Sequence, residues 1–175
     1  MIALRKTSAC VSLLLVMLWG CAAPDEPLTH NDPSRYALAA NVPWSAPEGF
    51  DLSMDIYTPR SGKASYPVLV IFHGGGWLIN DKSIMDQAAK YLVSNGEYVV
   101  CNVDYRLLGD QGNSVTLNEI VNDAFGAVLW VKDNIANYGG DPDRVALTGD
   151  SAGAHLAAAV VNLGPNLSIN GRGSI

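Results

Sequence analysis

Apolar residues occur along the chain in two alternating kinds of segment, short unbroken runs and longer stretches with helical spacing. The short runs, typical of strands buried on both faces of a parallel sheet, are 68–72, 98–103 and 145–148. The longer stretches, whose apolar positions fall on one side of a helix, are 83–94, 118–137 and 152–163. Strand and helix therefore alternate from residue 68 onward, which predicts an α/β fold with a mostly parallel sheet and right-handed crossovers.

Other segments predict edge strands, a loop and a tether. Residues 52–57 alternate apolar and polar side chains, as in a half-buried strand near a sheet edge, and 36–44 is expected to pair with them. The helix over 83–94 is expected to end at Asn95-Gly96, and 109–114 is expected to be a polar loop. Prolines and few large apolar residues indicate a flexible tether over 21–35.

The first 20 residues predict a targeting segment rather than a part of the fold. Arg5 and Lys6 precede an apolar run, 11–19, that is too short to span a bilayer. The junction at Gly20-Cys21 resembles a bacterial lipoprotein signal, in which Cys21 is lipidated and becomes the new N-terminus; an ordinary secretory signal is the alternative. Both imply an extracytoplasmic protein, secreted or held at the cell envelope by a lipid that tethers a soluble domain.

A glycine-containing motif, GDSAG at 149–153, lies between the strand at 145–148 and the helix at 152–163. This is the context of a nucleophile elbow. The sharp turn forces Ser151 into a strained backbone conformation and exposes its hydroxyl at a helix N-terminus, where amide N–H groups favour negative charge. Taken alone, the pattern also occurs by chance in glycine-rich chains.

A second motif, HGGGW at 73–77, follows the run at 68–72, and its three glycines leave the backbone free to turn N–H groups toward a ligand oxygen. The two motifs, with NDKS at 80–83 and DYRL at 104–107 between them, resemble the α/β-hydrolase fold. Within it they resemble the hormone-sensitive-lipase-like and feruloyl/acetylxylan-esterase-like carboxylesterases. The resemblance covers about residues 50–163 and implies helices on both faces of the sheet.

The resemblance also implies roles for individual residues. Ser151 would be the nucleophile that forms an acyl-enzyme. The oxyanion hole would be made by the N–H groups of Gly75, Gly76 and Ala152. The residues that would shape the two motifs are His73, Gly74, Gly149, Asp150 and Gly153. Trp77 and Tyr105, which follow sheet strands, would line a pocket or simply pack.

The remaining members of a catalytic triad are not found after Ser151. In α/β-hydrolases the acid and then the histidine follow the nucleophile on later loops. No Asp or Glu follows Ser151, and the one histidine, His155, is a helical turn away and is expected to pack against the elbow. We therefore expect residues 36–175 to be the N-terminal part of a larger catalytic domain, incomplete at its C-terminal side, with little or no esterase turnover alone and an open sheet edge.

The composition and charge of the chain limit the kinds of partner and bound group that it is expected to have. The chain has 17 acidic and 11 basic residues, a net charge of −6 and a pI near 4.8, which argues against nucleic-acid binding. Of three cysteines, Cys10 would leave with the signal, Cys21 would carry lipid, and Cys101 is expected to be a buried hydrophobe, so no disulfide framework is predicted. No residues have metal-ligand spacing, and no cofactor is expected.

The substrates implied by the resemblance are short acyl esters, or acetyl and feruloyl groups linked to plant polysaccharide. Two alternatives remain open from the sequence. One is a peptidase or amidase on the same fold, and the other is a non-catalytic binding protein that keeps the hydrolase scaffold.

Overall fold

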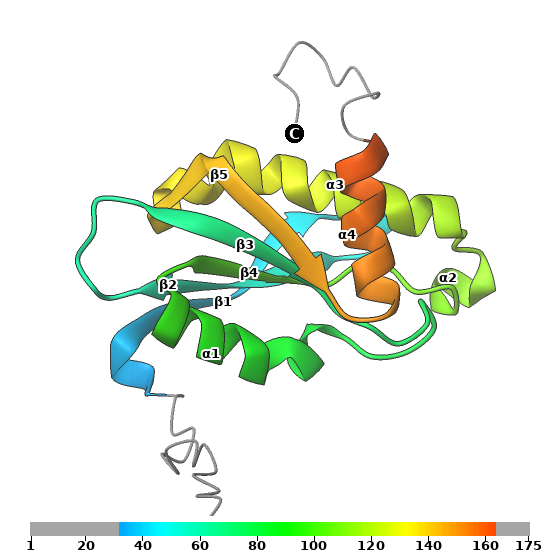
Figure 1. Ribbon diagram of the computed structural model, residues 1–175. Coiled ribbons are helices and arrows are strands. Elements are labelled where there is room, and N and C mark those ends of the chain that lie inside the picture. The colour runs from blue at the N-terminus through cyan, green and yellow to red at the C-terminus, as the bar shows by residue number, and fades with distance from the viewer. Residues whose placement is uncertain (1–31, 164–175) are drawn as a thin grey trace, which may run out of the picture.

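The computed structural model describes residues 32–163, which form a five-stranded sheet with helices on both faces (Figure 1). In spatial order the strands are β1 (Tyr36–Ser45), β2 (Leu52–Pro59), β4 (Val99–Val103), β3 (Tyr66–Phe72) and β5 (Gly140–Gly149). β4, β3 and β5 are parallel, but β1 and β2 form an antiparallel pair that also joins β4 antiparallel. The α/β class is confirmed, and the described sheet is mixed because the short connection between β1 and β2 permits only antiparallel pairing.

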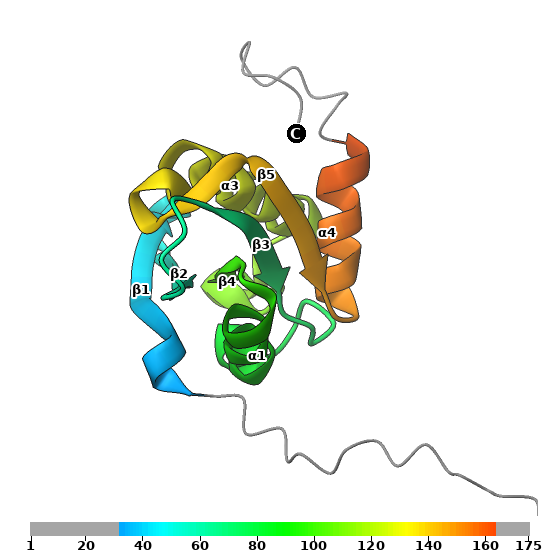
Figure 2. The same cartoon turned by 60° about the vertical axis from the view of Figure 1, so that its left-hand side comes forward.

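The helices follow the predicted apolar spacing. They are α1 (Asp86–Gly96), α3 (Leu117–Asn134) and α4 (Ala152–Leu163). α1 packs against β2 and β4, whereas α3 and α4 pack against β5 and against each other. Figure 2 shows α1 and α4 on opposite sides of β3. The sheet is therefore covered on both faces, as the resemblance implies.

The helix expected over 83–94 begins later than predicted. The Asp81 carboxylate accepts a hydrogen bond from the Ser83 N–H at 2.8 Å, and this cap starts a 3-10 turn, η3 (Lys82–Met85), ahead of α1. The helix ends at Gly96, the glycine of the predicted Asn95-Gly96 signal, and the residue in the left-handed region is Glu97, at φ 53°.

Two other boundaries differ. The helix expected over 118–137 changes into a 3-10 turn, η4 (Ile135–Tyr138), after which Gly139 reverses the chain with φ 78°. Within the polar loop expected at 109–114, Asp110–Asn113 form a helical turn, α2, that contains three residues with positive φ. Local hydrogen bonds decide both of these boundaries, and the spacing of apolar residues does not reveal such bonds.

The predicted signal at 1–20, Cys21 and most of the tether lie outside the described residues. The last part of the predicted tether forms a 3-10 turn, η1 (Pro33–Arg35), which is joined to the sheet by a hydrogen bond of 2.8 Å from the Arg60 N–H to the Arg35 carbonyl. Among residues 32–163, no helix has the length and apolar character needed to cross a bilayer.

Each face of the sheet buries its own apolar cluster, because alternate side chains of a strand point to opposite faces. Val68, Val70 and Phe72 of β3 point into the larger cluster, which lies under α3 and α4. Ile71 points into the smaller one, under α1. Cys101 is a buried free cysteine in the larger cluster, as expected, and burial raises the pKa of its thiol.

The strand that leads into the GDSAG motif lies at one edge of the described sheet. β5 pairs with β3, and no other strand of residues 32–163 pairs with its outer side (Figure 2). The residues of β5 are mostly half-buried or exposed, whereas those of β3 are mostly buried. The open edge expected beside the elbow is therefore present in this part of the chain.

Candidate active site

The GDSAG motif forms a sharp turn between β5 and α4. Ser151 has φ 48°, in the left-handed region that residues other than glycine rarely adopt, and its side chain is exposed. Hydrogen bonds to the Asp150 carbonyl from Gly153 N–H (2.7 Å) and Ala154 N–H (3.3 Å) start the helix at once. Such strain costs about 1–3 kcal/mol and is concentrated at functional sites. The backbone therefore has the predicted elbow conformation.

The two outer glycines of this elbow are needed because the turn lies directly against the end of β3. A Cβ on Gly149 would lie 2.5 Å from the Phe72 carbonyl oxygen and 2.5 Å from the Gly153 carbonyl carbon. A Cβ on Gly153 would overlap the Phe72 carbonyl oxygen and lie 2.7 Å from that of His73. These neighbours are backbone atoms of α4, of the paired strand β3 and of the residue that follows it, so they cannot move aside as a side chain could.

We expect Gly153→Ala to lower the free energy of unfolding by about 3 kcal/mol, at the upper end of overpacking effects, since the added methyl group meets backbone. Urea denaturation followed by circular dichroism measures this. Gly109→Ala is the matched control, because Gly109 has φ −80° and a Cβ there would meet only Asn113 Oδ1 at 3.8 Å. Equal urea midpoints for the two variants would contradict the close approach of Gly153 to the backbone at the end of β3.

The glycine loop (residues 73–80) lies beside this elbow. A Cβ on Gly74 would overlap the Asp150 carboxylate, so Gly74 and the residue before Ser151 are in direct contact. Gly75 and Gly76 have φ 125° and 62°, and the Gly75 carbonyl accepts hydrogen bonds from the N–H groups of residues 78 and 79 at 3.1 and 3.2 Å. The Gly75 carbonyl is thus bonded within the backbone of the loop itself.

The amide groups predicted to form an oxyanion hole have no other hydrogen-bond acceptor. Within residues 32–163, the N–H groups of Gly75, Gly76 and Ala152 donate to no backbone or side-chain acceptor. Ala152 is also the first residue of α4, where the helix dipole places partial positive charge. Unused donors beside an exposed serine can stabilise an anion that forms on a bound carbonyl group.

His73 is buried under the glycine loop. Its Nδ1 lies 2.8 Å from the Gly74 carbonyl oxygen, which can only accept, so Nδ1 carries the proton. The ring stacks on Tyr105 with centroids 4.2 Å apart, and the Tyr105 hydroxyl donates to the His73 carbonyl at 2.5 Å. Burial, with the charges of Asp150 and Asp104, raises the pKa of Tyr105 and keeps it a donor. His73 is thus fixed in the loop, and Tyr105 both packs against His73 and lines a pocket with Asn80 and Leu107.

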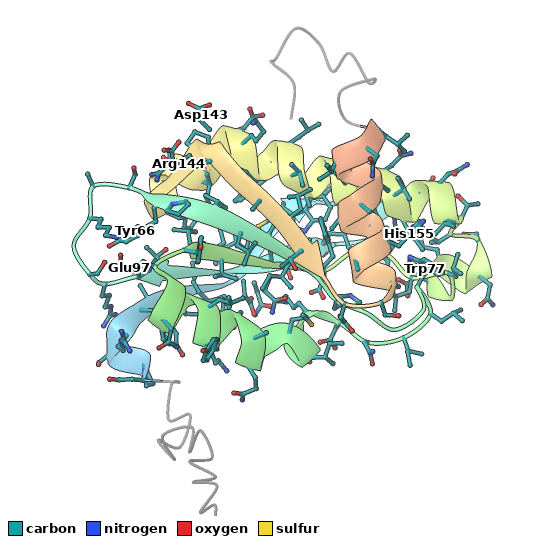
Figure 3. The ribbon with its side chains drawn as sticks, viewed as in Figure 1. Tyr66, Trp77, Glu97, Asp143, Arg144 and His155 are labelled. Atoms are coloured by element: carbon teal, nitrogen blue, oxygen red, sulfur yellow. The ribbon has the colours of Figure 1, made fainter. Side chains whose placement is uncertain are left out.

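The sequence predicts that His155 packs against the elbow, but the structure places its ring against the glycine loop. Its side chain is exposed, and its ring meets that of Trp77 edge to face, with centroids 5.3 Å apart at 81° (Figure 3). The contact therefore joins α4 to the glycine loop, which the one-turn spacing from Ser151 could not reveal. Within residues 32–163, the Ser151 hydroxyl has no hydrogen-bond partner, and no three His, Cys, Asp or Glu residues are grouped to hold a metal ion.

One ion-pair cluster, which sequence reasoning did not assign, holds the far end of the glycine loop. Lys82 Nζ lies 2.9 Å from Asp104 and 3.8 Å from Asp55, and the Lys82 N–H donates to Asp104 at 2.7 Å. Lys82 and Asp104 come from the NDKS and DYRL motifs, and Asp55 comes from β2. The charged residues of the two motifs are visible in the sequence, but nothing local shows that they pair.

A second cluster, also missed, holds the loop after β4. Arg106 is buried and donates to both carboxylate oxygens of Asp123 on α3, at 2.8 Å each. The hydrogen bonds that Arg106 donates to Asp123 raise the pKa of Arg106, against the effect of burial. Two residues further on, the Leu108 N–H donates to the Trp77 carbonyl at 2.8 Å. The charged residues of the second motif therefore support the glycine loop.

Known proteins share this arrangement. Residues 54–172 match the BD-FAE family model. The chain is 34% identical over 113 residues to carboxylesterase NlhH of Mycobacterium tuberculosis, an alignment that covers 65% of this chain and 34% of NlhH. A hyperthermophilic esterase of Pyrobaculum calidifontis superimposes with a TM-score of 0.66 at 30% identity, over 74% of this chain and 40% of the esterase. The thermophilic esterase Est2 of Thermogutta terrifontis does so with a TM-score of 0.65 at 28% identity, over 79% and 48%.

The chain thus spans between a third and a half of the length of these three relatives. The family match takes in more than half of the chain and includes both the glycine loop and the elbow. The resemblance to α/β-hydrolase carboxylesterases is confirmed. This chain belongs to the BD-FAE family and has the α/β-hydrolase fold.

Proposed function

We propose that the protein containing this chain hydrolyses carboxylic esters and that Ser151 is its nucleophile. The observation that carries the proposal is the strained, exposed Ser151 at the start of α4, beside the unused N–H groups of the glycine loop. The esterase names of the relatives support the same reaction. A binding protein on this scaffold would need neither the strain nor the free donors.

In the proposed reaction, Ser151 Oγ attacks the carbonyl carbon of the ester and passes its proton to a general base. The carbonyl oxygen becomes an oxyanion, which accepts hydrogen bonds from Gly75, Gly76 and Ala152. The intermediate collapses, the carbon–oxygen bond of the alcohol breaks, and the alcohol leaves with the proton. Water then attacks the acyl-enzyme by the same steps and releases the acid.

Neither described histidine supports the role of base. His73 is buried with its Nδ1 proton on a carbonyl group, and His155 is held against Trp77. We therefore place the base and its orienting carboxylate in parts of the full protein outside residues 32–163. Without them, the oxyanion donors and binding would supply only about 10³–10⁴-fold catalysis over water.

A fluorophosphonate probe, which reacts with activated serine hydroxyls, tests the proposal in the native protein. We expect covalent labelling at Ser151, mapped by mass spectrometry, and turnover of p-nitrophenyl acetate that the probe abolishes. The paired amide, p-nitroacetanilide, separates an esterase from an amidase. Labelling at another serine, or none in a protein that hydrolyses the ester, would exclude Ser151 as the nucleophile.

The proposed substrates are short acyl esters, including acetyl and feruloyl groups linked to polysaccharide. Two facts support this proposal. The chain has an acidic net charge, which is compatible with uncharged ester substrates, and it belongs to the BD-FAE family. Release of acetate from acetylated xylan, compared with release from p-nitrophenyl acetate, separates a polysaccharide-linked substrate from a free small ester.

The proposed location is outside the cytoplasm, with a lipid anchor at Cys21. The residues that support it are the basic start, the short apolar run and the Gly20-Cys21 junction. We expect cells fed radiolabelled palmitate to label the wild-type protein, and the Cys21→Ala variant to carry no label and leave the membrane fraction. An unlabelled wild-type protein in the soluble fraction would show a secretory signal instead.

A further inference from the structure

The side chains of the glycine loop that make hydrogen bonds, His73 and Asn80, reach only the Gly74 carbonyl. Positive φ angles occur at Gly75, Gly76, Trp77 and Asn80, so most of its turns are in conformations that are easily perturbed. The two apolar side chains at 78 and 79 are 58% and 62% exposed, and they hold nothing in place. A loop of this kind needs a contact from outside to keep its N–H groups in one position.

Trp77 supplies such a contact directly after the two proposed donor residues. Its carbonyl accepts a hydrogen bond from the Leu108 N–H at 2.8 Å, which fixes the backbone on one side. Its half-buried ring lies edge to face with His155. The indole N–H is buried without an acceptor among residues 32–163, so the ring acts through packing and not through a hydrogen bond.

His155 in turn is fixed relative to the nucleophile. Its N–H donates to the Ser151 carbonyl at 3.1 Å, within the first turn of α4. The contact of the two rings therefore joins the residue after the glycines to the helical turn that presents Ser151, and Figure 3 shows the two side chains together at this end of α4. Loop and elbow also meet where Gly74 approaches Asp150 and where the His73 carbonyl approaches Gly153.

We propose that Trp77 and His155 are a pair of positioning residues, which hold the N–H groups of Gly75 and Gly76 at a fixed distance from Ser151 Oγ. The inference rests on the proposed ester hydrolysis. Neither ring reacts; the pair keeps the oxyanion donors where negative charge develops. Since small displacements of such donors reduce transition-state stabilisation more than substrate binding, the effect falls on kcat.

The experiment compares the native protein with Trp77→Ala, His155→Ala, the double variant and His155→Phe, using p-nitrophenyl acetate. We expect each alanine variant to lose about ten-fold in kcat with KM within about two-fold, because displacement of catalytic groups costs up to about 10²-fold. The double variant should lose no more than the single ones, since the two rings act as one contact. His155→Phe keeps an aromatic ring but cannot titrate, and it should restore kcat to within about two-fold with an unchanged pH profile.

Tyr91→Ala is the matched control, because Tyr91 is an exposed aromatic residue on α1, on the other face of the sheet. It should keep kcat and KM. Hydrogen exchange of residues 74–80, measured by mass spectrometry on folded protein, gives a readout that does not depend on activity. We expect His155→Ala to speed exchange there and to leave β3 unchanged.

Several results would overturn the pairing. They are unchanged kcat and unchanged exchange in His155→Ala, multiplicative losses in the double variant, or a His155→Phe protein as impaired as His155→Ala. The last result would assign His155 a proton-transfer role. A wild-type protein that does not hydrolyse esters would instead refute the proposed function, while the exchange experiment would still test the contact.

Discussion

Ser151→Ala is expected to reduce kcat for p-nitrophenyl acetate in the native protein by about 10⁵–10⁶-fold, the loss seen when the nucleophile of a complete triad is removed. The reason is chemical, because no acyl-enzyme can form without the hydroxyl. Alanine also accepts φ 48° no better than serine, so the elbow keeps its strain and the fold is expected to change little.

The measurement needs stopped or long-time assays, because the residual rate is only about 10³–10⁴-fold above the uncatalysed one. Ser34→Ala is the control, since Ser34 is exposed in η1, far from the elbow in the sequence. It should keep wild-type turnover. If Ser151→Ala retained more than about one hundredth of the wild-type rate, a different nucleophile or a different mechanism would be at work.

Asp123→Ala is expected to lower the free energy of unfolding by about 3–5 kcal/mol, as when one partner of a buried ion pair is lost. The variant leaves the Arg106 guanidinium buried, with Glu119 at 3.6 Å as its remaining ion-pair partner. It also frees the Arg106 N–H, which donates to Asp123 at 3.2 Å. The loop that holds Trp77 through Leu108 is thereby loosened, so ester turnover should fall as well.

Urea denaturation at neutral pH measures the loss of stability. Asp141→Ala is the matched control: Asp141 pairs with Arg144, whose side chain is half exposed, and it should cost less than about 1 kcal/mol. The double variant Arg106→Met with Asp123→Leu removes both charges and should recover much of the loss. Equal urea midpoints for the Asp123 and Asp141 variants would show that the buried ion pair contributes no more to stability than the exposed one.

The order and type of the main elements could be predicted from the sequence, because apolar spacing differs between buried strands and amphipathic helices. The run at 68–72 became the central β3, and the stretch at 152–163 became α4 with the predicted bounds. Helix ends were predicted less well. The cap at Asp81 and the 3-10 turn at Ile135–Tyr138 depend on single hydrogen bonds, which leave no period in the sequence.

The backbone of the candidate site could be predicted at the positions where a motif requires glycine. The glycines at 149 and 153 predict a tight turn, and in the structure each lies against the β3 backbone with no room for a Cβ. The charged motifs were recognised by resemblance, but their physical role was not. Lys82 pairs with Asp104 over 22 positions and Arg106 with Asp123 over 17, and chain separation of this kind gives no local signal.

The sequence alone determined the α/β class, the elbow and the glycine loop, because local spacing and the steric demands of glycine act over a few residues. The tertiary structure alone decided that His155 meets Trp77 and that His73 is fixed by Tyr105. It also decided that two ion-pair clusters hold the loop. Contacts between distant segments depend on the order and twist of the strands, since these set which residues meet at the carboxyl ends of β3, β4 and β5.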